Sequence, residues 1–163
     1  MKKIILILLM LCSPVYASTK PWFSDFIKND SIVIVKSERK LYYFDTLGEV
    51  HQYPVAIGKV TTPSPTGEFK VAKKVTNPTW YPPNSIRYEN PQHPLPEFVP
   101  PGPDNPLGPR AIYFSSDLIR IHGTNKPSSI GKAVSHGCFR MKNKDVVDLY
   151  NKVAVGTSIY VFK

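Results

Sequence analysis

Proline is concentrated between residues 82 and 109, where it fills ten of 28 positions, and this concentration constrains the fold more than any other feature of the chain. Proline has no backbone N–H to donate and interrupts both helices and central strands. The segment is therefore predicted to be a long, stiff excursion over the surface. A linker is the alternative, but a linker here divides the chain into pieces too small to fold alone. A lid or wall beside a functional site is the preferred interpretation, because long ordered loops in compact domains are usually functional.

The rest of the chain carries the signals of short β-strands. Segments rich in β-branched and aromatic residues alternate with turns, and they predict strands at 31–35, 40–44, 50–57, 67–71, 111–114, 118–121 and 158–162. One clear helix is predicted after Asn143, which can cap it, and before Gly156, which can stop it. Together these signals predict a mostly β domain, either a sandwich or a partly open barrel, with one helix near the C-terminus.

The N-terminus is typical of a secretory signal peptide. Two lysines precede a short apolar run, and Ala17 closes a small-residue cleavage site. The apolar run is too short for a retained membrane anchor, and Leu11 is larger than the residue expected before a lipidated Cys12. We therefore expect an exported protein. Its predicted parts are a signal peptide at 1–17, a lead-in at 18–30 and one folded domain at 31–163.

Loss of the signal peptide leaves Cys138 as the only cysteine. Exported proteins normally use cysteines in pairs as disulfides, so a single thiol indicates catalysis, with an intermolecular disulfide as the alternative. The net charge of +9, which falls to +7 when Lys2 and Lys3 are removed, favours an anionic polymer such as cell wall, a membrane surface or nucleic acid. Nucleic acid is the weakest of these candidates, because the aromatic residues are not interleaved with the lysines as in known binding modules.

The chemistry is expected in a short stretch that contains Cys138 and two histidines. A thiol is a strong nucleophile as a thiolate, and an imidazole within hydrogen-bond reach can take its proton. His136 lies two positions before Cys138 and would share its face on a strand, whereas His122 has to be brought in by the fold. Gly137 permits a close approach or an unusual turn, and backbone N–H groups near Cys138 can polarise a carbonyl oxygen.

A zinc site and an inert buried thiol are the simpler interpretations of Cys138. A structural zinc site normally needs four protein ligands, and His51 and His93 have no ligand-like spacing. A polar, glycine-flanked sequence with a second histidine nearby does not have the character of a core. We therefore predict a nucleophile and no metal.

The stretch resembles the catalytic signature of the L,D-transpeptidase, or YkuD-like, family. Twelve residues separate His122 from the sequence Ser135-His136-Gly137-Cys138-Phe139-Arg140, and this spacing fits the family. Residues 62–69 (TPSPTGEF) resemble the family's segment before the active site. Residues 80–83 (WYPP) and 95–103 (LPEFVPPGP) resemble the branch found in enterobacterial cell-wall enzymes. The resemblance covers residues 31–163, so it does not depend on one short motif.

The resemblance implies the β-sandwich of YkuD-like domains and an acyl transfer without metal or organic cofactor. Cys138 is then the nucleophile, and His122 is the general base and acid. The other residues of the signature are implied to support the site. An oxyanion site and its surroundings are assigned to Gly123, Ser135, His136 and Gly137, and substrate binding to Arg140.

The implied acyl donor is the stem peptide of peptidoglycan, cut before a terminal D-alanine through a thioester. The acceptor stays open: a second stem peptide gives a cross-link, and a lysine of a lipoprotein attaches that protein to the wall. Water makes the enzyme an L,D-carboxypeptidase or another hydrolase. Carbapenem-type compounds are the implied inhibitors, and the periplasm is the implied location. A non-catalytic cell-wall-binding module is the alternative from a different functional class.

Overall fold

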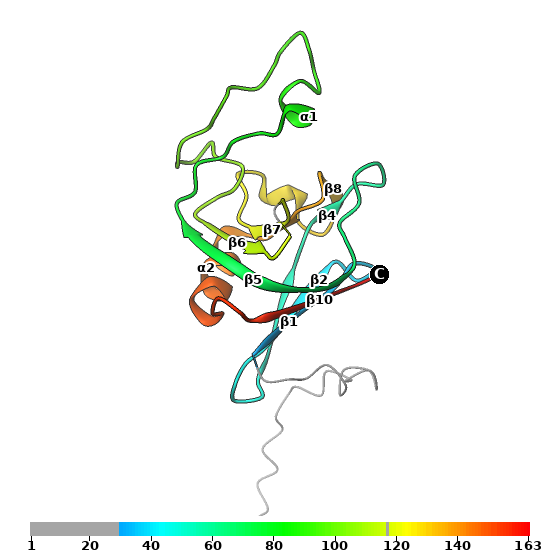
Figure 1. The fold of residues 1–163 in the computed structure, drawn as a ribbon, viewed down its shortest axis with the longest axis vertical. Helices are drawn as coiled ribbons and strands as arrows, with labels where there is room; N and C mark the ends of the chain where they lie inside the picture. The colour runs from blue at the N-terminus through cyan, green and yellow to red at the C-terminus, as the bar shows by residue number, and fades with distance from the viewer. Residues whose placement is uncertain (1–29, 117) are drawn as a thin grey trace, which may run out of the picture.

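The computed structural model describes residues 30–116 and 118–163, so the predicted signal peptide at 1–17 and nearly all of the lead-in at 18–30 lie outside the described residues. Within these ranges, eight strands form one sheet in the order β3-β2-β1-β10-β5-β6-β7-β9, and two strands form a small parallel sheet (Figure 1). The large sheet consists of β1 (Ser31–Val35), β2 (Lys40–Phe44), β3 (Val50–Pro54), β5 (Gly67–Thr76), β6 (Arg110–Phe114), β7 (Arg120–His122), β9 (Phe139–Arg140) and β10 (Ser158–Phe162). The small sheet consists of β4 (Ile57–Gly58) and β8 (Ala133–Ser135).

Strand β5 connects the two halves of the large sheet. Residues 67–70 pair with β10, residues 71–76 pair with β6, and the register is irregular between Val71 and Lys73. An irregularity of this kind bends a strand and increases its twist, so the sheet curls. The main core draws residues from both halves and from the C-terminal helix, including the fully buried Ile34, Ile112 and Leu149. The prediction of a mostly β, sandwich-like fold is confirmed.

Helix α2 (Asn143–Lys152) is the predicted helix near the C-terminus, and it packs against β6 and β7. The predicted cap is wrong: Lys142 is the N-cap residue, and Asn143 is the first residue of the helix. The Asn143 side-chain oxygen instead accepts a hydrogen bond from the Thr124 amide at 2.8 Å. This bond fastens the helix to the loop that follows His122. No helix in the described part of the chain is long and apolar enough to cross a membrane.

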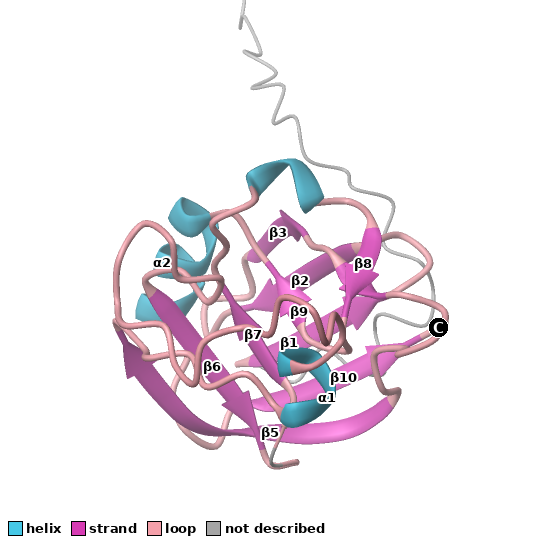
Figure 2. Ribbon diagram, turned by 90° about the horizontal axis from the view of Figure 1, so that it is seen from above, coloured by secondary structure: helices cyan, strands magenta, loops and turns pink. Residues whose placement is uncertain are grey.

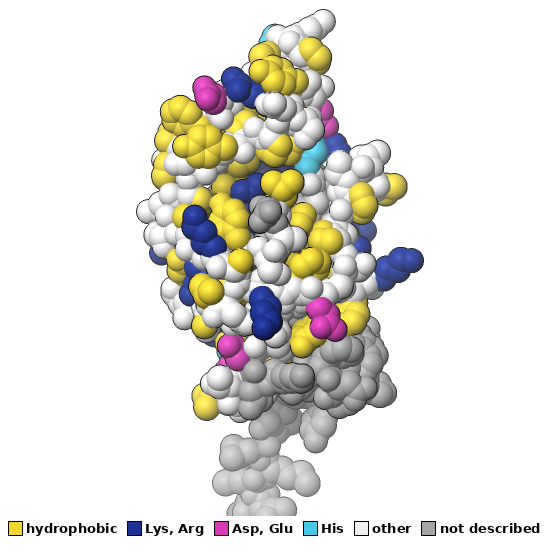
Figure 3. All heavy atoms as spheres, in the orientation of Figure 1, with side chains coloured by type: hydrophobic (Ala, Val, Ile, Leu, Met, Phe, Trp, Pro, Cys, Tyr) yellow, Lys and Arg dark blue, Asp and Glu magenta, His cyan; other side chains and the backbone are white. Residues whose placement is uncertain are grey.

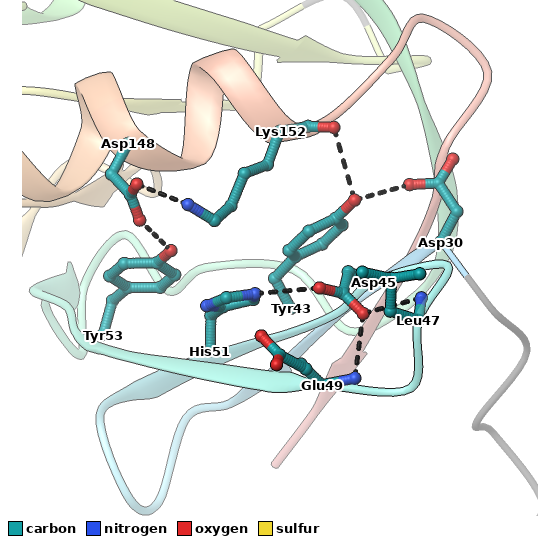
Figure 4. Close-up of polar contacts among 9 residues, drawn as sticks. All are labelled: Asp30, Tyr43, Asp45, Leu47, Glu49, His51, Tyr53, Asp148 and Lys152. Atoms are coloured by element: carbon teal, nitrogen blue, oxygen red, sulfur yellow. Dashed lines mark hydrogen bonds and ion pairs between the residues drawn. The ribbon is translucent and has the colours of Figure 1, made fainter.

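A set of tyrosine hydrogen bonds joins α2 to the β2–β3 hairpin (Figure 4). The Tyr53 hydroxyl donates to Asp148, whose carboxylate also accepts from Lys152 one helical turn later. The Tyr43 hydroxyl donates to Asp30 at 2.9 Å. Burial, together with the Asp148 carboxylate, raises the pKa of the Tyr53 hydroxyl. Tyr53 therefore stays a donor at neutral pH and keeps the helix attached to this end of the sheet.

The predicted strands differ from the observed ones in several places. Strand β5 continues to Thr76 instead of ending at 71, β7 covers Arg120–His122 instead of 118–121, and β9 was not predicted. The single strand expected at 50–57 is divided into β3 and β4, because Val55 and Ala56 bond elsewhere: the Val55 amide donates to Arg39, and Ala56 forms an isolated bridge with Arg140. Strand β8 was not predicted. Its pairing partner β4 lies far away in sequence, and three residues carry too short a pattern to indicate a strand.

The Pro-rich segment rises above the sheet as a long excursion (Figure 1), as predicted, but it contains a helix that was not expected. Helix α1 (Asn84–Arg87) is one turn long and follows Pro82 and Pro83, with Pro83 as its N-cap residue. Proline is tolerated at the start of a helix because the first N–H groups have no intrahelical partner. Apolar side chains remain exposed on this upper part of the molecule (Figure 3), among them Tyr81 and Phe98, whose ring centres lie 6.0 Å apart.

Two backbone hydrogen bonds and the buried side-chain amide of Asn105 hold the base of the excursion together. The Trp80 amide donates to the Val99 carbonyl at 2.9 Å, and the Val99 amide donates back at 2.8 Å. Asn105 is buried. Its side-chain nitrogen donates to three backbone carbonyls at 2.8 to 3.0 Å, those of Pro78, Val99 and Pro100. Prolines supply acceptors without donors, so a side-chain amide at this point gives the Pro78 and Pro100 carbonyls a donor.

Candidate active site

Strands β7 and β9 place four polar side chains on one face of the sheet. The strands are parallel, with Ile121 opposite Phe139 and His122 opposite Arg140. Because side chains alternate along a strand, Ile121 and Phe139 enter the core, where both are fully buried, and the flanking residues point the other way. Those residues line a cavity of about 380 Å³, and they are Arg120, His122, Cys138 and Arg140. The structure thus brings His122 into the same cavity as Cys138, the nucleophile predicted from the sequence.

His122 is held as a neutral imidazole. Its side chain is 5% exposed, and Nδ1 lies 2.6 Å from the Gly123 carbonyl oxygen. A carbonyl only accepts, so in the neutral ring Nδ1 carries the proton and Nε2 does not. The backbone of Pro106 makes a second contact with the imidazole. Burial, and then the nearby Arg120 charge, lower the pKa of His122 to about 3. At neutral pH this side chain can therefore take a proton without first losing one.

We expect His122 to make the stability of the protein depend on pH. Its pKa is about 3 when folded and near 6.5 when unfolded, so between these values only the unfolded chain binds the extra proton. The contribution is constant above pH 6.5 and falls as the pH drops below it, by roughly 2 kcal/mol between pH 6.5 and 5. Chemical unfolding of the native chain and of His122→Gln across this range measures the effect. The free energy of unfolding of the native chain should fall relative to that of His122→Gln as the pH drops from 6.5 to 5. If the two free energies changed in parallel with pH, the low pKa of His122 would be contradicted.

The Ser135-His136-Gly137 segment shapes the backbone in front of Cys138. The Ser135 hydroxyl donates to the Cys138 carbonyl at 2.5 Å and accepts from the Gly137 amide at 3.2 Å. Gly137 has a φ of +107°, a conformation that favours glycine. For this reason His136 and Cys138 do not sit on one strand, as the sequence suggested, but on the two sides of a bend. The Cys138 thiol is half-buried and lies 3.5 Å from the Leu118 carbonyl oxygen.

Arg120 is a site residue that the sequence analysis missed. Its guanidinium interacts with the Cys138 side chain and with the Tyr113 hydroxyl, and its carbon lies 5.4 Å from the centre of the Tyr113 ring. Burial opposes its charge, but the Cys138 thiol and the Tyr113 hydroxyl outweigh that effect and raise the pKa of Arg120. Arg140 lies on the same face and also interacts with the thiol. The signal for Arg120 was available, since a residue two positions before His122 on a strand shares its face.

Glu89 and Lys59 are two further residues that the sequence did not indicate. The Glu89 carboxylate accepts from the Lys59 ammonium at 2.8 Å through one oxygen, and its other oxygen lies 3.0 Å from His136 Nε2. The bond from Lys59 and the nearby His136 lower the pKa of Glu89, which is therefore a carboxylate at neutral pH. Glu89 belongs to the Pro-rich excursion, 47 positions before His136, and no local pattern predicts that contact.

The Pro-rich excursion forms one wall of the cavity that contains Cys138, as the sequence analysis predicted. Its apolar contribution to the lining consists of Trp80, Ile86, Leu95, Val99, Pro106 and Leu107. The excursion also supplies Glu89 and Asp104 to the same lining. The cavity therefore has a cationic floor from the sheet and a mainly apolar wall from the excursion.

The segment at 62–69 stabilises the backbone around the site through hydrogen bonds. Ser64 is buried, and its hydroxyl accepts from the Gly58 amide at 2.8 Å, while the Thr62 hydroxyl donates to the Ser135 carbonyl at 3.3 Å. A Cβ at Gly58 would lie 2.3 Å from the Thr62 carbonyl oxygen, so only glycine fits. Gly123, predicted as a supporting residue, is constrained in the same way, because a Cβ there would lie 2.4 Å from Asn143 Oδ1.

In the part of the chain that the structure describes, one group of side chains has the spacing of metal ligands, and it lies away from Cys138. Ligand atoms of Asp45, Glu49 and His51 lie within 4.8 Å of one another on the β2–β3 hairpin. The Asp45 carboxylate is already engaged by His51 Nε2 at 3.2 Å and by two backbone amides (Figure 4). Nothing further indicates a bound ion at this hairpin.

Most of the sequence is similar to proteins of one known family. Residues 29–161 match the YkuD family, described as the L,D-transpeptidase catalytic domain. The chain belongs to this family. It is 41% identical over 135 residues to the probable L,D-transpeptidase YbiS of Escherichia coli strain K12, covering 80% of this chain and 44% of that protein. It is 39% identical over 140 residues to the probable L,D-transpeptidase ErfK/SrfK of the same strain, covering 84% and 45%. The chain thus spans less than half the length of these relatives.

Solved structures of the family share the fold of this chain. L,D-transpeptidase 3 from Mycobacterium tuberculosis superimposes with a TM-score of 0.66 at 17% identity, covering 82% of this chain and 60% of that one. The C442S mutant of the Enterococcus faecium L,D-transpeptidase gives 0.64 at 22% identity, covering 83% and 50%. The predicted family and its enterobacterial branch are confirmed by the family match and the Escherichia coli relatives.

Proposed function

We propose that the protein is a cysteine-dependent L,D-transpeptidase that transfers the acyl group of a peptidoglycan stem peptide through a thioester. The observation that carries this proposal is the arrangement of Cys138 and a neutral, buried His122 in one cavity of a YkuD-family domain. A neutral imidazole with Nε2 unprotonated is the form that accepts a thiol proton. Of the possible bases, only His122 has this environment among the histidines described.

The first half of the reaction acylates the enzyme. His122 Nε2 takes the Cys138 proton, the sulfur attacks the peptide carbonyl, and a C–S bond replaces the C–N bond to the terminal D-alanine. The same proton leaves with the D-alanine amine. In the second half an acceptor amine attacks the thioester, a C–N bond replaces the C–S bond, and the proton lost by the amine returns to sulfur through His122.

The oxyanion of each half-reaction is assigned to the backbone at Cys138. The Gly137 amide already donates to Ser135, so the Cys138 amide is the donor that Ser135 does not engage. Ser135 then serves to fix the bend, and Gly123 serves to fix the His122 ring through its carbonyl. Arg120 and Arg140 line the cavity beside Cys138 and attract the carboxylates of the donor peptide.

The substrates and the location follow from the family and remain parts of this proposal. The acyl acceptor is a second stem peptide or a lysine of a lipoprotein, and the exported chain acts in the periplasm. Relatives have been solved with β-lactams: L,D-transpeptidase 3 of Mycobacterium tuberculosis with a faropenem-derived adduct, and LdtMt1 with imipenem. We extend this binding to the present chain, with Cys138 as the point of attachment. A hydrolase that uses water as acceptor is the second candidate, because Cys138 lies in an open cavity.

Two measurements on the purified chain test the proposal. Incubation with a disaccharide-tetrapeptide, followed by mass spectrometry, should yield free D-alanine and a cross-linked product, whereas a hydrolase yields D-alanine and the tripeptide alone. A carbapenem should add the mass of one molecule to the native chain and none to Cys138→Ala. Binding of wall fragments with neither product nor adduct would instead support a non-catalytic wall-binding module.

A further inference from the structure

Cys138 lies where two cavities meet, and Glu89 lines both. The first cavity, of about 380 Å³, contains His122 and Arg140. The second, of about 410 Å³, lies toward the loop that contains Lys59, Thr61 and Thr62. Both are lined by Ile86, Glu89, Arg120, His136 and Cys138. Two substrates that react in turn at one sulfur can therefore reach it by two approaches.

Both cavities contain side chains of both charges. The first cavity contains Asp104, Lys126 and Arg140 in addition to the shared Glu89 and Arg120, and its cations can pair with the carboxylates of a peptide. The second contains Lys59 in addition to the shared pair. In the second cavity, Glu89 is the only acidic residue that the described lining contains. An acceptor amine is an ammonium at neutral pH, and the arginines beside Cys138 repel it. A carboxylate is therefore needed near the sulfur if the amine is to be held there.

Glu89 has the geometry to hold such an ammonium. Its side chain is 53% exposed, although Lys59 and His136 each hold one of its oxygens. A carboxylate offers about four lone-pair sites, so these two contacts leave acceptor capacity free toward the cavities. The two contacts also fix the carboxylate in position, because they fasten it to Lys59 on one side and to a residue two positions from Cys138 on the other.

We propose that the Glu89 carboxylate recognises the protonated amino group of the acyl acceptor and places it near the thioester at Cys138, where the group loses one proton to solvent and attacks as the neutral amine. This inference rests on the proposed transpeptidase function and makes Glu89 a specificity-determining residue. Glu89 then determines whether the acyl group is transferred to an amine or lost to water. Lys59 competes with the incoming ammonium for the same carboxylate.

The test separates acylation from transfer and uses two variants with opposite expected effects. The donor is a disaccharide-tetrapeptide, and the acceptor probe is a synthetic tripeptide stem whose last residue carries a free side-chain amine. Release of D-alanine in a single turnover measures acylation, and the ratio of cross-linked to hydrolysed product at rising acceptor concentration gives the apparent KM for the amine. Glu89→Gln keeps the size of the side chain and removes its charge. Lys59→Met removes the competing cation and leaves the carboxylate.

We expect Glu89→Gln to raise the apparent KM for the acceptor at least about tenfold, the usual effect of losing a charge-assisted hydrogen bond, and to affect acylation much less. Lys59→Met should lower this KM. If Glu89 only fastens the excursion over the site, both variants should slow acylation and transfer by similar factors, and the proposal is overturned. An unchanged acceptor KM in Glu89→Gln overturns it as well. A native chain that releases no D-alanine overturns the transpeptidase function itself, and this inference with it.

Discussion

Cys138→Ala is expected to reduce turnover to an undetectable level while leaving the free energy of unfolding within about 1 kcal/mol of the native value. The reason is the position of the sulfur: it is half-buried, it lines the cavity, and the hydrogen bond that its thiol donates to the Leu118 carbonyl is long at 3.5 Å. Its removal therefore costs the protein little packing. D-alanine release and thermal unfolding, measured on the same preparation, check both parts. Residual turnover would mean that another group is the nucleophile.

The second large effect is expected from His122→Gln, which should lower the rate of acylation by about 10²- to 10⁴-fold, the usual contribution of a positioned general base. Glutamine preserves much of the side-chain volume but cannot accept and return a proton. The same variant should slow alkylation of Cys138 by iodoacetamide at neutral pH. D-alanine release in a single turnover and the alkylation rate are the two measurements.

His136→Gln is the matched control for that experiment. Its imidazole is held by Glu89 and Lys59 at the rim of the site, so its loss should disturb the shape of the site with a smaller effect on alkylation. If His136→Gln slowed alkylation and His122→Gln did not, the base would have been assigned to the wrong histidine.

The sequence predicted those features of the fold that depend on local pattern. Strands β1, β2 and β10 were predicted with the observed bounds, because their β-branched and aromatic residues lie between clear turns. The pairing of β1 with β10, which joins the two ends of the domain, has no such local signal. The three-residue strand β8 was missed for the same reason, since it exists only through its partner β4.

The residues of the site likewise fall into those that the sequence indicated and those that only the tertiary structure shows. His122 and Cys138 were predicted because catalysis needs these residue types together and because their spacing resembles that of a family. The resemblance did not extend to Arg120, Lys59 and Glu89, which reach the sulfur or its neighbours through the curl of the sheet and the course of the excursion. Charge at such positions is a tertiary property: an isolated glutamate in a Pro-rich segment has the same sequence context whether it lies in solvent or beside a thiol.

The parallel pairing of β7 with β9 has a consequence for how such sites change during evolution. The relative position of the His122 imidazole and the Cys138 sulfur is set by two adjacent residue pairs in the sheet, Ile121 with Phe139 and His122 with Arg140. The residues between them leave the sheet and return to it, so their number does not determine that relative position. Related chains can therefore gain or lose residues between the two strands while the reacting atoms keep their separation. A deletion of one residue inside either strand, in contrast, would turn His122 or Cys138 toward the core.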